Sequence, residues 1–82
     1  MRLDLFLKTT TLIKRRTIAK ELVEKGKILA NEKIVKPSYE VKDGDVLTLI
    51  LGNRKIVVKA SFVNNGKKIV PNVEQLSMEK IC

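Results

Sequence analysis

Residues 12–30 read LIKRRTIAKELVEKGKILA, and the hydrophobic period changes within this stretch. Up to Lys25, apolar residues recur three and four positions apart, which predicts an amphipathic helix over residues 12–25. The predicted buried stripe of this helix consists of Ile18, Ala19, Leu22 and Val23. Gly26 is the residue type expected at a left-handed helix C-cap, and short β-branched runs follow it. The change after Gly26 therefore predicts helices first and a sheet afterwards.

Four short apolar runs after Gly26 predict strands, and tight turns join them in pairs. Asn31-Glu32 joins the first pair as a hairpin, although Glu is a weaker turn residue than Gly. Gly52-Asn53-Arg54 joins the second pair in the same way. The predicted strands cover residues 28–30, 33–35, 46–51 and 55–60.

A shorter helix is predicted at the start of the sequence, because Leu3, Phe6 and Leu7 follow helical spacing. The residues of this segment that are expected to face solvent are Arg2, Asp4 and Lys8. Together these patterns predict an α+β fold. Two or three N-terminal helices are expected to pack on one face of a small, mainly antiparallel sheet of four to five strands.

Basic residues far outnumber acidic ones. The chain has 17 Lys and Arg against 9 Asp and Glu, a net charge of +8 on 82 residues, which points to a polyanionic partner. Residues 1–27 carry eight of the basic and three of the acidic groups, so the partner is expected to meet this third of the chain. No apolar stretch approaches the roughly 18 residues of a membrane-spanning helix, and Asp4 and Lys8 interrupt any signal-peptide core. We expect a cytoplasmic protein with no membrane role.

Residue types that carry out catalysis or bind metals are scarce. The chain has no His, and Cys82 is its one cysteine, so neither an internal disulfide nor a usual zinc ligand set can form. No nucleophile beside a base and no Gly-rich phosphate loop is visible. Asp43 and Asp45 flank Gly44 with the spacing of turn chemistry. We therefore expect no catalytic residue, no metal and no cofactor.

One cluster of basic residues is the candidate binding site. It consists of Lys14, Arg15, Arg16 and Lys20, widened by Arg2 and Lys8 from the first predicted helix. Arg side chains on a helix can bind phosphates across an RNA minor groove, and the 4% aromatic content argues against a single-strand binder that stacks bases. A merely solvated helix face is the alternative that stays open. Arg16 is expected to lie away from the core, so Arg16→Ala should change the free energy of unfolding by less than about 0.5 kcal/mol.

Five motifs resemble, in order and spacing, the RNA-binding domain first described in small-subunit ribosomal protein four. They are Arg2-Leu3-Asp4, residues 12–19, Gly26-Lys27-Ile28, Val35-Lys36-Pro37-Ser38 and Gly44-Asp45. The combination of motifs is specific, although no single one would be. The resemblance covers roughly residues 1–60, nearly the whole chain, and therefore points to the stand-alone bacterial proteins of the RqcP and heat-shock-protein-fifteen family. The tail from Phe62 onward resembles no part of that pattern.

This resemblance implies a function and a set of partners. Family members bind the large ribosomal subunit when peptidyl-tRNA obstructs it, so rRNA of that subunit and peptidyl-tRNA are the expected partners. The RqcP-like members act in ribosome-associated quality control, where they help a tRNA-recruiting protein add a C-terminal alanine tail to the stalled chain. We also expect a monomer. Two alternatives stay open, namely a generic rRNA- or tRNA-binding assembly factor and a basic protein-interaction module.

The resemblance also implies binding residues and a division of the chain. It assigns Arg2 and Arg16 to the RNA-contacting arginine positions, whereas Thr11 stands where Arg is common, which weakens one expected contact. The full expected RNA-binding set is Arg2, Lys8, Lys14, Arg15, Arg16, Lys20 and Lys36. Residues 1–60 are expected to form the S-four-like domain. Residues 61–82 are expected to form a C-terminal extension that is an edge strand, a short helix over 73–81 or a tail.

Overall fold

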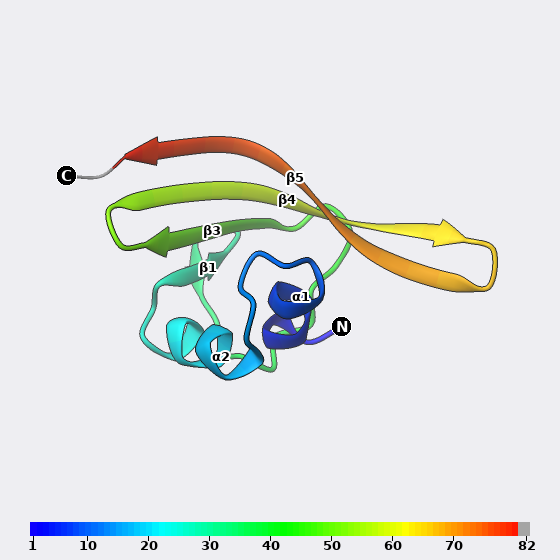
Figure 1. Ribbon diagram of the computed structural model, residues 1–82, viewed down its shortest axis with the longest axis horizontal. Helices are drawn as coiled ribbons and strands as arrows, with labels where there is room; N and C mark the ends of the chain where they lie inside the picture. Colours follow the sequence, from blue (N-terminus) through cyan, green and yellow to red (C-terminus); the bar gives the residue numbers. More distant parts are fainter. Residues whose placement is uncertain (81–82) are drawn as a thin grey trace.

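The two hydrophobic periods fold into two layers. A computed structural model describes residues 1–80, in which two helices lie under one face of a five-stranded antiparallel sheet (Figure 1). The elements are α1 (Leu3–Thr9), α2 (Arg16–Glu24), β1 (Ile28–Ala30), β2 (Lys33–Ile34), β3 (Val46–Leu51), β4 (Arg54–Asn65) and β5 (Lys68–Lys80). The strand order is β2-β1-β3-β4-β5, and every neighbouring pair is antiparallel. The predicted α+β fold is confirmed.

The core lies between the helices and the sheet. Leu3, Phe6 and Leu7 of α1 are fully buried, as their helical spacing predicted. On β3, Leu47 and Leu49 occupy alternate positions, are fully buried, and face the same side of the sheet, the side that the helices cover. The remaining buried hydrophobic side chains are Ile13, Ala19, Val23, Ile28, Ala30, Val41, Val58 and Ala60. This small aliphatic core fixes the helices relative to the sheet.

The second helix is shorter than predicted and is rotated about its axis. It begins at Arg16 rather than at Leu12, because the Ile13 side chain is buried and its N–H donates to the Leu7 carbonyl, 3.1 Å away. Residues 10–15 therefore form the connection from α1, which turns through Thr11 at a φ of 62°. Ile18, expected on the buried stripe, is 43% exposed.

The end of α2 agrees with the prediction. Gly26 has a φ of 74° and donates its N–H to the Val23 carbonyl at 3.1 Å. The Lys27 N–H donates to the Leu22 carbonyl at 2.9 Å, which completes a Schellman motif. A residue with a Cβ would be strained at this φ, and so Gly26 allows the chain to leave the helix directly into β1.

The predicted hairpin around Asn31-Glu32 is confirmed. Leu29 pairs with Ile34 and Ala30 with Lys33, which leaves a two-residue turn between the strands. Asn31 and Glu32 both adopt positive φ, at 52° and 64°. This is the left-handed conformation that a type I′ turn requires and that Gly tolerates better than Glu.

Strands β4 and β5 form a long hairpin that extends beyond the rest of the domain (Figure 1). β4 runs across residue 60 without a break, so the predicted division of the chain falls inside a strand. Of the three alternatives for residues 61–82, the described part up to Lys80 takes the edge strand, because β5 is last in the strand order. A helix over residues 73–81 is excluded for 73–80, while Ile81 and Cys82 lie outside the described residues.

Candidate RNA-binding surface

The first turn of α1 is held in place by the loop that follows β2. The Leu3 N–H donates to the Tyr39 carbonyl at 2.8 Å, and the Asp4 N–H donates to the Pro37 carbonyl at 3.2 Å. The first N–H groups of a helix have no partner within the helix, so these carbonyls replace the side-chain cap that Arg2 does not provide. The two contacts fix the backbone that carries Arg2 and Asp4.

Asp4 lies buried between two arginines. Its side chain was expected to face solvent, but the residue is 2% exposed. The Arg2 Nε lies 3.4 Å from Asp4 Oδ1, and the Arg16 Nε lies 3.3 Å from Asp4 Oδ2. A buried carboxylate needs such partners, because an isolated buried charge is costly. We call Arg2 and Arg16, held by Asp4, the arginine pair.

The position of Arg16 follows from its spacing to the buried residues of α2. Arg16, Ala19 and Val23 stand at i, i+3 and i+7, so all three lie on one face of the helix. Ala19 and Val23 are fully buried, and at the first turn the same face meets Asp4 of α1. The expectation that Arg16 points away from the core is therefore wrong. The i, i+3, i+7 spacing was a signal in the sequence that could have placed it.

The arginine pair is oriented but still accessible. The Arg2 and Arg16 side chains are 50% and 46% exposed, and each contacts Asp4 through Nε, the nitrogen nearest the aliphatic stem. A phosphate could thus approach the terminal guanidinium nitrogens from solvent. Arg15, the N-cap residue of α2, makes no side-chain capping hydrogen bond, so the first N–H groups of that helix are further donors for an anion.

The other predicted residues surround this pair unevenly. Lys14 and Arg15 are exposed in the connection before α2, and Lys20 is exposed one turn after Arg16. Lys36 is exposed beside Pro37, whose carbonyl contacts α1. Lys8 is exposed in the last turn of α1, roughly 9 Å along the helix axis from Arg2 at 1.5 Å per residue, and is the most peripheral member.

We call these seven residues the basic cluster; six of them lie in or next to α1 and α2, and Lys36 lies in the loop after β2. They are Arg2, Lys8, Lys14, Arg15, Arg16, Lys20 and Lys36.

A carboxylate network, which sequence reasoning had assigned only to turn chemistry, fixes the loop that holds α1. Asp45 Oδ2 accepts hydrogen bonds from the Tyr39 hydroxyl at 2.8 Å and from the Lys42 N–H at 2.9 Å. Asp45 Oδ1 accepts one from the Asn31 amide at 3.3 Å. Desolvation by burial acts to raise the pKa of Asp45, but these hydrogen bonds and the Lys42 charge together lower it below its ordinary value. The pKa of Tyr39 is raised above its ordinary value by its hydrogen bond to Asp45, by burial and by the negative charge of Asp45.

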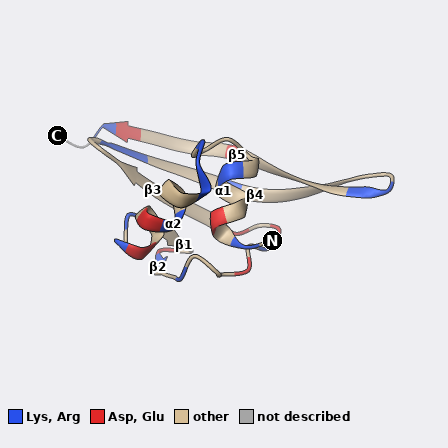
Figure 2. Ribbon diagram, turned by 60° about the horizontal axis from the view of Figure 1, so that its bottom comes forward, with Lys and Arg blue, Asp and Glu red and all other residues tan. Residues whose placement is uncertain are grey.

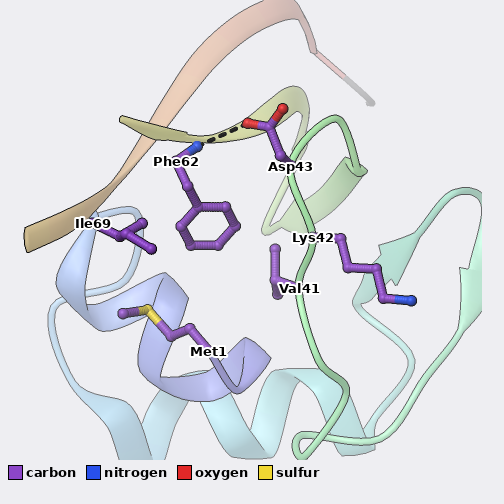
Figure 3. A pocket seen from close by; sticks show the side chains of 6 residues that line it. All are labelled: Met1, Val41, Lys42, Asp43, Phe62 and Ile69. Atoms are coloured by element: carbon purple, nitrogen blue, oxygen red, sulfur yellow. Dashed lines mark hydrogen bonds between the residues drawn. The ribbon is translucent and has the colours of Figure 1, made fainter. Parts of the chain in front are cut away.

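A shallow apolar hollow of about 490 Å³ lies where the β4–β5 hairpin passes the start of the chain (Figure 3). It is lined by Met1, Val41, Lys42, Asp43, Phe62 and Ile69. The Phe62 N–H donates to Asp43 Oδ1 at 2.9 Å, and the Phe62 ring meets Phe6 of α1 edge-on with centroids 5.7 Å apart. These contacts anchor the base of the hairpin to the domain. The six residues that line the hollow contain no nucleophile paired with a base.

Within residues 1–80, no three or more potential metal-ligating side chains come together. Neither of the two described helices is long and apolar enough to cross a membrane.

Comparison with known proteins identifies relatives over the whole chain. Residues 1–47 match the S4 domain family. The chain is 40% identical over 81 residues to the RQC P-site tRNA stabilizing factor of Halalkalibacterium halodurans, covering 99% of this chain and 89% of that protein. The protein of the same name from Bacillus subtilis is 44% identical over 68 residues, which cover 83% of this chain and 79% of that protein.

A solved structure supports the same fold. The trimeric structure of Vibrio cholerae Heat Shock Protein 15 matches with a TM-score of 0.78 at 24% sequence identity, covering 94% of this chain and 82% of that one. The Heat shock protein 15 homolog of Haemophilus influenzae is 32% identical over 79 residues, which cover 96% of this chain and 60% of that protein. The likeness thus extends past the 47 residues of the S4 match and includes most of the long hairpin.

Proposed function

The chain belongs to the S4 domain family and, within it, to the RQC P-site tRNA stabilizing factors, and from this we propose that it binds the large ribosomal subunit and stabilises a tRNA in the P site. On this proposal the bound tRNA is a peptidyl-tRNA left on an obstructed subunit. The protein then acts in ribosome-associated quality control, while a tRNA-recruiting protein supports the addition of a C-terminal alanine tail.

The arginine pair is the observation that carries the proposal. Two guanidinium groups are held by one buried carboxylate, Asp4, and each keeps about half of its side chain accessible. Held in this way, they lose little conformational freedom when they bind phosphate oxygens, which favours tight and oriented binding. Flexible lysines on a solvated surface would not provide this orientation.

We assign the rRNA and tRNA contacts to the whole basic cluster. Arg2 and Arg16 grip phosphates, while Lys14, Arg15 and Lys20 extend the positive surface and Lys8 and Lys36 form its margin. Residues 1–60 are proposed as the RNA-binding domain and residues 61–82 as its extension. We propose a cytoplasmic, monomeric binding factor with no catalytic step, in keeping with relatives named as stabilizing factors.

Reconstitution on ribosomal subunits tests this function. Large subunits carrying peptidyl-tRNA, and the same subunits after puromycin has released the peptide, are each sedimented with the protein. We expect retention on the first sample, loss of retention with Arg2→Ala/Arg16→Ala, and failure of the same variant to restore alanine tailing in cells that lack the protein. Equal retention of the double variant would exclude the arginine pair as the RNA contact.

Two alternatives predict different outcomes of the same experiments. A generic assembly factor would bind both subunit samples equally and would leave alanine tailing unchanged. A basic protein-interaction module would stay with its partner after nuclease digestion of a lysate, whereas an RNA-binding factor would leave the ribosomal fractions. Analytical ultracentrifugation of the free protein tests the proposed monomer.

A further inference from the structure

The outer part of the β4–β5 hairpin has no other element beside it. We call residues 63–70 the ribbon tip; all eight are exposed, and they project past the helices and the other strands (Figure 1). Val63 pairs with Val70, Asn64 with Ile69, and Asn65 with Lys68, so the two strands stay in register up to the turn. Gly66 forms that turn at a φ of 72°. The tip is thus a regular two-stranded ribbon.

Such a ribbon gains from contact with a second surface. A two-stranded hairpin is marginally stable in water unless a third strand or a packed face supports it. Here Val63, Ile69 and Val70 remain 50%, 68% and 43% exposed. The tip therefore presents ordered backbone and apolar side chains to a partner.

The charge of the tip indicates the chemistry of that partner. No acidic residue occurs between Asp45 and Glu74, a stretch that includes all of β4 and the turn. At the end of the hairpin away from the tip, Lys55 lies opposite Glu79 and Lys59 opposite Glu74, so these two lysines have an acid across the ladder, whereas Arg54 and Lys80 lie opposite each other. At the tip, Lys68 lies opposite the neutral Asn65, and Lys67 is in the turn. The two lysines of the tip thus have no acid across the ladder, and all of the side chains around them are exposed.

We propose that the ribbon tip is a second RNA contact, in which Lys67 and Lys68 bind the phosphate backbone of an RNA segment other than the one that the basic cluster meets. This inference rests on the proposed function and extends it. Exposed amides of Asn64 and Asn65 supply hydrogen-bond donors for phosphate or ribose oxygens. Val63 and Val70 pack against the riboses of the same RNA segment.

The shape of the molecule supports two separate contacts. The ribbon runs along the longest dimension of 43 Å, and the tip lies at one end of it, away from the helices that carry the basic cluster (Figure 1 and Figure 2). Two contacts far apart on one rigid body raise the effective concentration of each for its RNA segment. The ribbon would in this way fix the orientation of the protein on the ribosome, while the basic cluster supplies most of the affinity.

Matched charge deletions on one hairpin test the inference. Lys67→Ala/Lys68→Ala removes the tip charge, and Lys55→Ala/Lys59→Ala removes the same charge from the base. Binding to large subunits carrying peptidyl-tRNA is measured over a salt series. We expect the tip variant to bind about tenfold more weakly, with a slope of log K against log salt that is shallower by about 1.5, as for two lost phosphate contacts. The base variant should keep the wild-type slope.

The outcomes separate the two proposals. If the wild-type protein does not bind these subunits, the proposed function fails and the ribbon contact fails with it. If the wild type binds and the tip variant shows its affinity and slope, only the ribbon contact is overturned. The ribbon contact would also be overturned if Val63→Thr/Val70→Thr bound more weakly while Lys67→Ala/Lys68→Ala bound like the wild type. That result would favour an apolar contact with a protein. Lys67→Gln/Lys68→Gln, which keeps the side-chain stems, must reproduce the alanine result.

A chemical probe locates the RNA directly. Cys82 is the chain's one cysteine, so a Cys82→Ser background accepts a single new cysteine at Asn65→Cys or, as the control, at Ser77→Cys near the base of the hairpin. An iron chelate attached there generates hydroxyl radicals on the bound subunit. We expect cleavage of rRNA or tRNA from position 65 and little from position 77. Absence of RNA cleavage from position 65 would overturn the proposed contact.

Discussion

On the proposed function, Asp4 contributes to RNA binding by orienting Arg2 and Arg16, without facing the RNA itself. An arginine loses about 2 kcal/mol of side-chain conformational entropy when it is fully fixed, and Asp4 imposes part of that order before any ligand arrives. The buried carboxylate also reduces the local positive charge. The remaining lysines and Arg15 are exposed and restore the attraction for phosphates. The buried carboxylate therefore lowers the positive charge of the surface but orients the guanidinium donors of Arg2 and Arg16.

Replacement of Arg16 is expected to affect both RNA binding and stability. Arg16→Ala leaves Asp4 with Arg2 as its one described ion-pair partner, so we expect a loss of about 1 kcal/mol in unfolding free energy, more than the sequence alone predicted. Retention on large subunits should be abolished. Arg16→Lys should also be impaired, because an ammonium group cannot bind a phosphate in the bidentate manner of guanidinium. Co-sedimentation and thermal melting measure the two effects.

Lys20→Ala is the matched control for Arg16→Ala. Lys20 is exposed one turn further along α2 and makes none of the described ion pairs. Its removal should lower RNA affinity mildly and leave the melting temperature unchanged. A melting temperature of Arg16→Ala equal to that of the wild type would show that the Asp4 contact contributes nothing to stability.

Asp45 should make the stability of the fold depend on pH in the acid range. Its pKa is lowered in the folded state from the ordinary 3.8, so its stabilising contribution is complete above that value and is lost as the pH falls through the folded-state pKa. At pH 7, Asp45→Asn should cost about 1 kcal/mol. The difference in unfolding free energy between wild type and variant should shrink below about pH 3.8.

Urea denaturation at pH 7, 5 and 3 measures this difference. Tyr39→Phe, which removes one of the hydrogen bonds to Asp45, should show the same trend at smaller amplitude. A difference between wild type and Asp45→Asn that stays constant over this range would contradict the linkage.

At the level of the elements, the sequence predicted which helices and strands form better than it predicted where each of them begins and ends. Gly26 ended the helix and the apolar runs became strands, because both depend on residues within a few positions of each other. The start of α2 was misplaced because Ile13 is buried by tertiary contact with α1, which removes residues 12–15 from the helix. Ile18 was misassigned because four apolar residues span too wide an arc for one face. Packing against α1 selects Ala19 and Val23 instead.

The β1–β2 turn offers a stabilising substitution. Glu32 has a φ of 64°, a conformation that costs a residue with a Cβ roughly 1 kcal/mol and costs Gly nothing. Glu32→Gly should therefore raise the unfolding free energy by about 0.5–1 kcal/mol and create the Asn-Gly pair that favours type I′ turns. Glu32→Ala keeps the Cβ and removes the same charge, so it should give no gain. Equal stabilisation by both variants would attribute the effect to charge rather than to the backbone.

At the level of the whole molecule, the sequence identified the candidate binding residues but not how their side chains are held. The charge imbalance over residues 1–27 and the family motifs located the basic cluster. The burial of Asp4 was not predictable from its neighbours, because it needs the loop at Pro37 and the first turn of α2 to close over it. The length of β5 was also missed. Its polar residues alternate weakly, and its pairing with β4 supplies the strand order that the sequence lacked.

Binding to ribosomal RNA is expected to depend strongly on salt. If the basic cluster neutralises about five phosphates, it should contribute about −4 to the slope of log K against log salt, and the proposed ribbon-tip contact should add about −1.5 in the wild-type protein. Filter binding or sedimentation from 50 to 300 mM KCl measures it. A slope near zero would show that the interaction is mainly non-electrostatic and would contradict the role given to the cluster.

The contacts between α1 and the loop at residues 37–41 also determine the order in which the chain folds. Neighbouring strands in the β3–β4–β5 part of the sheet follow each other in sequence, so these hairpins close short loops and form early. The hydrogen bond from Leu3 to Tyr39 closes a loop of more than thirty residues. Closing this loop costs more conformational entropy than closing the short hairpin loops. On refolding of the complete chain, the surface proposed to bind RNA is therefore expected to be among the last parts to assemble. The β3–β4–β5 hairpins are expected to form before it.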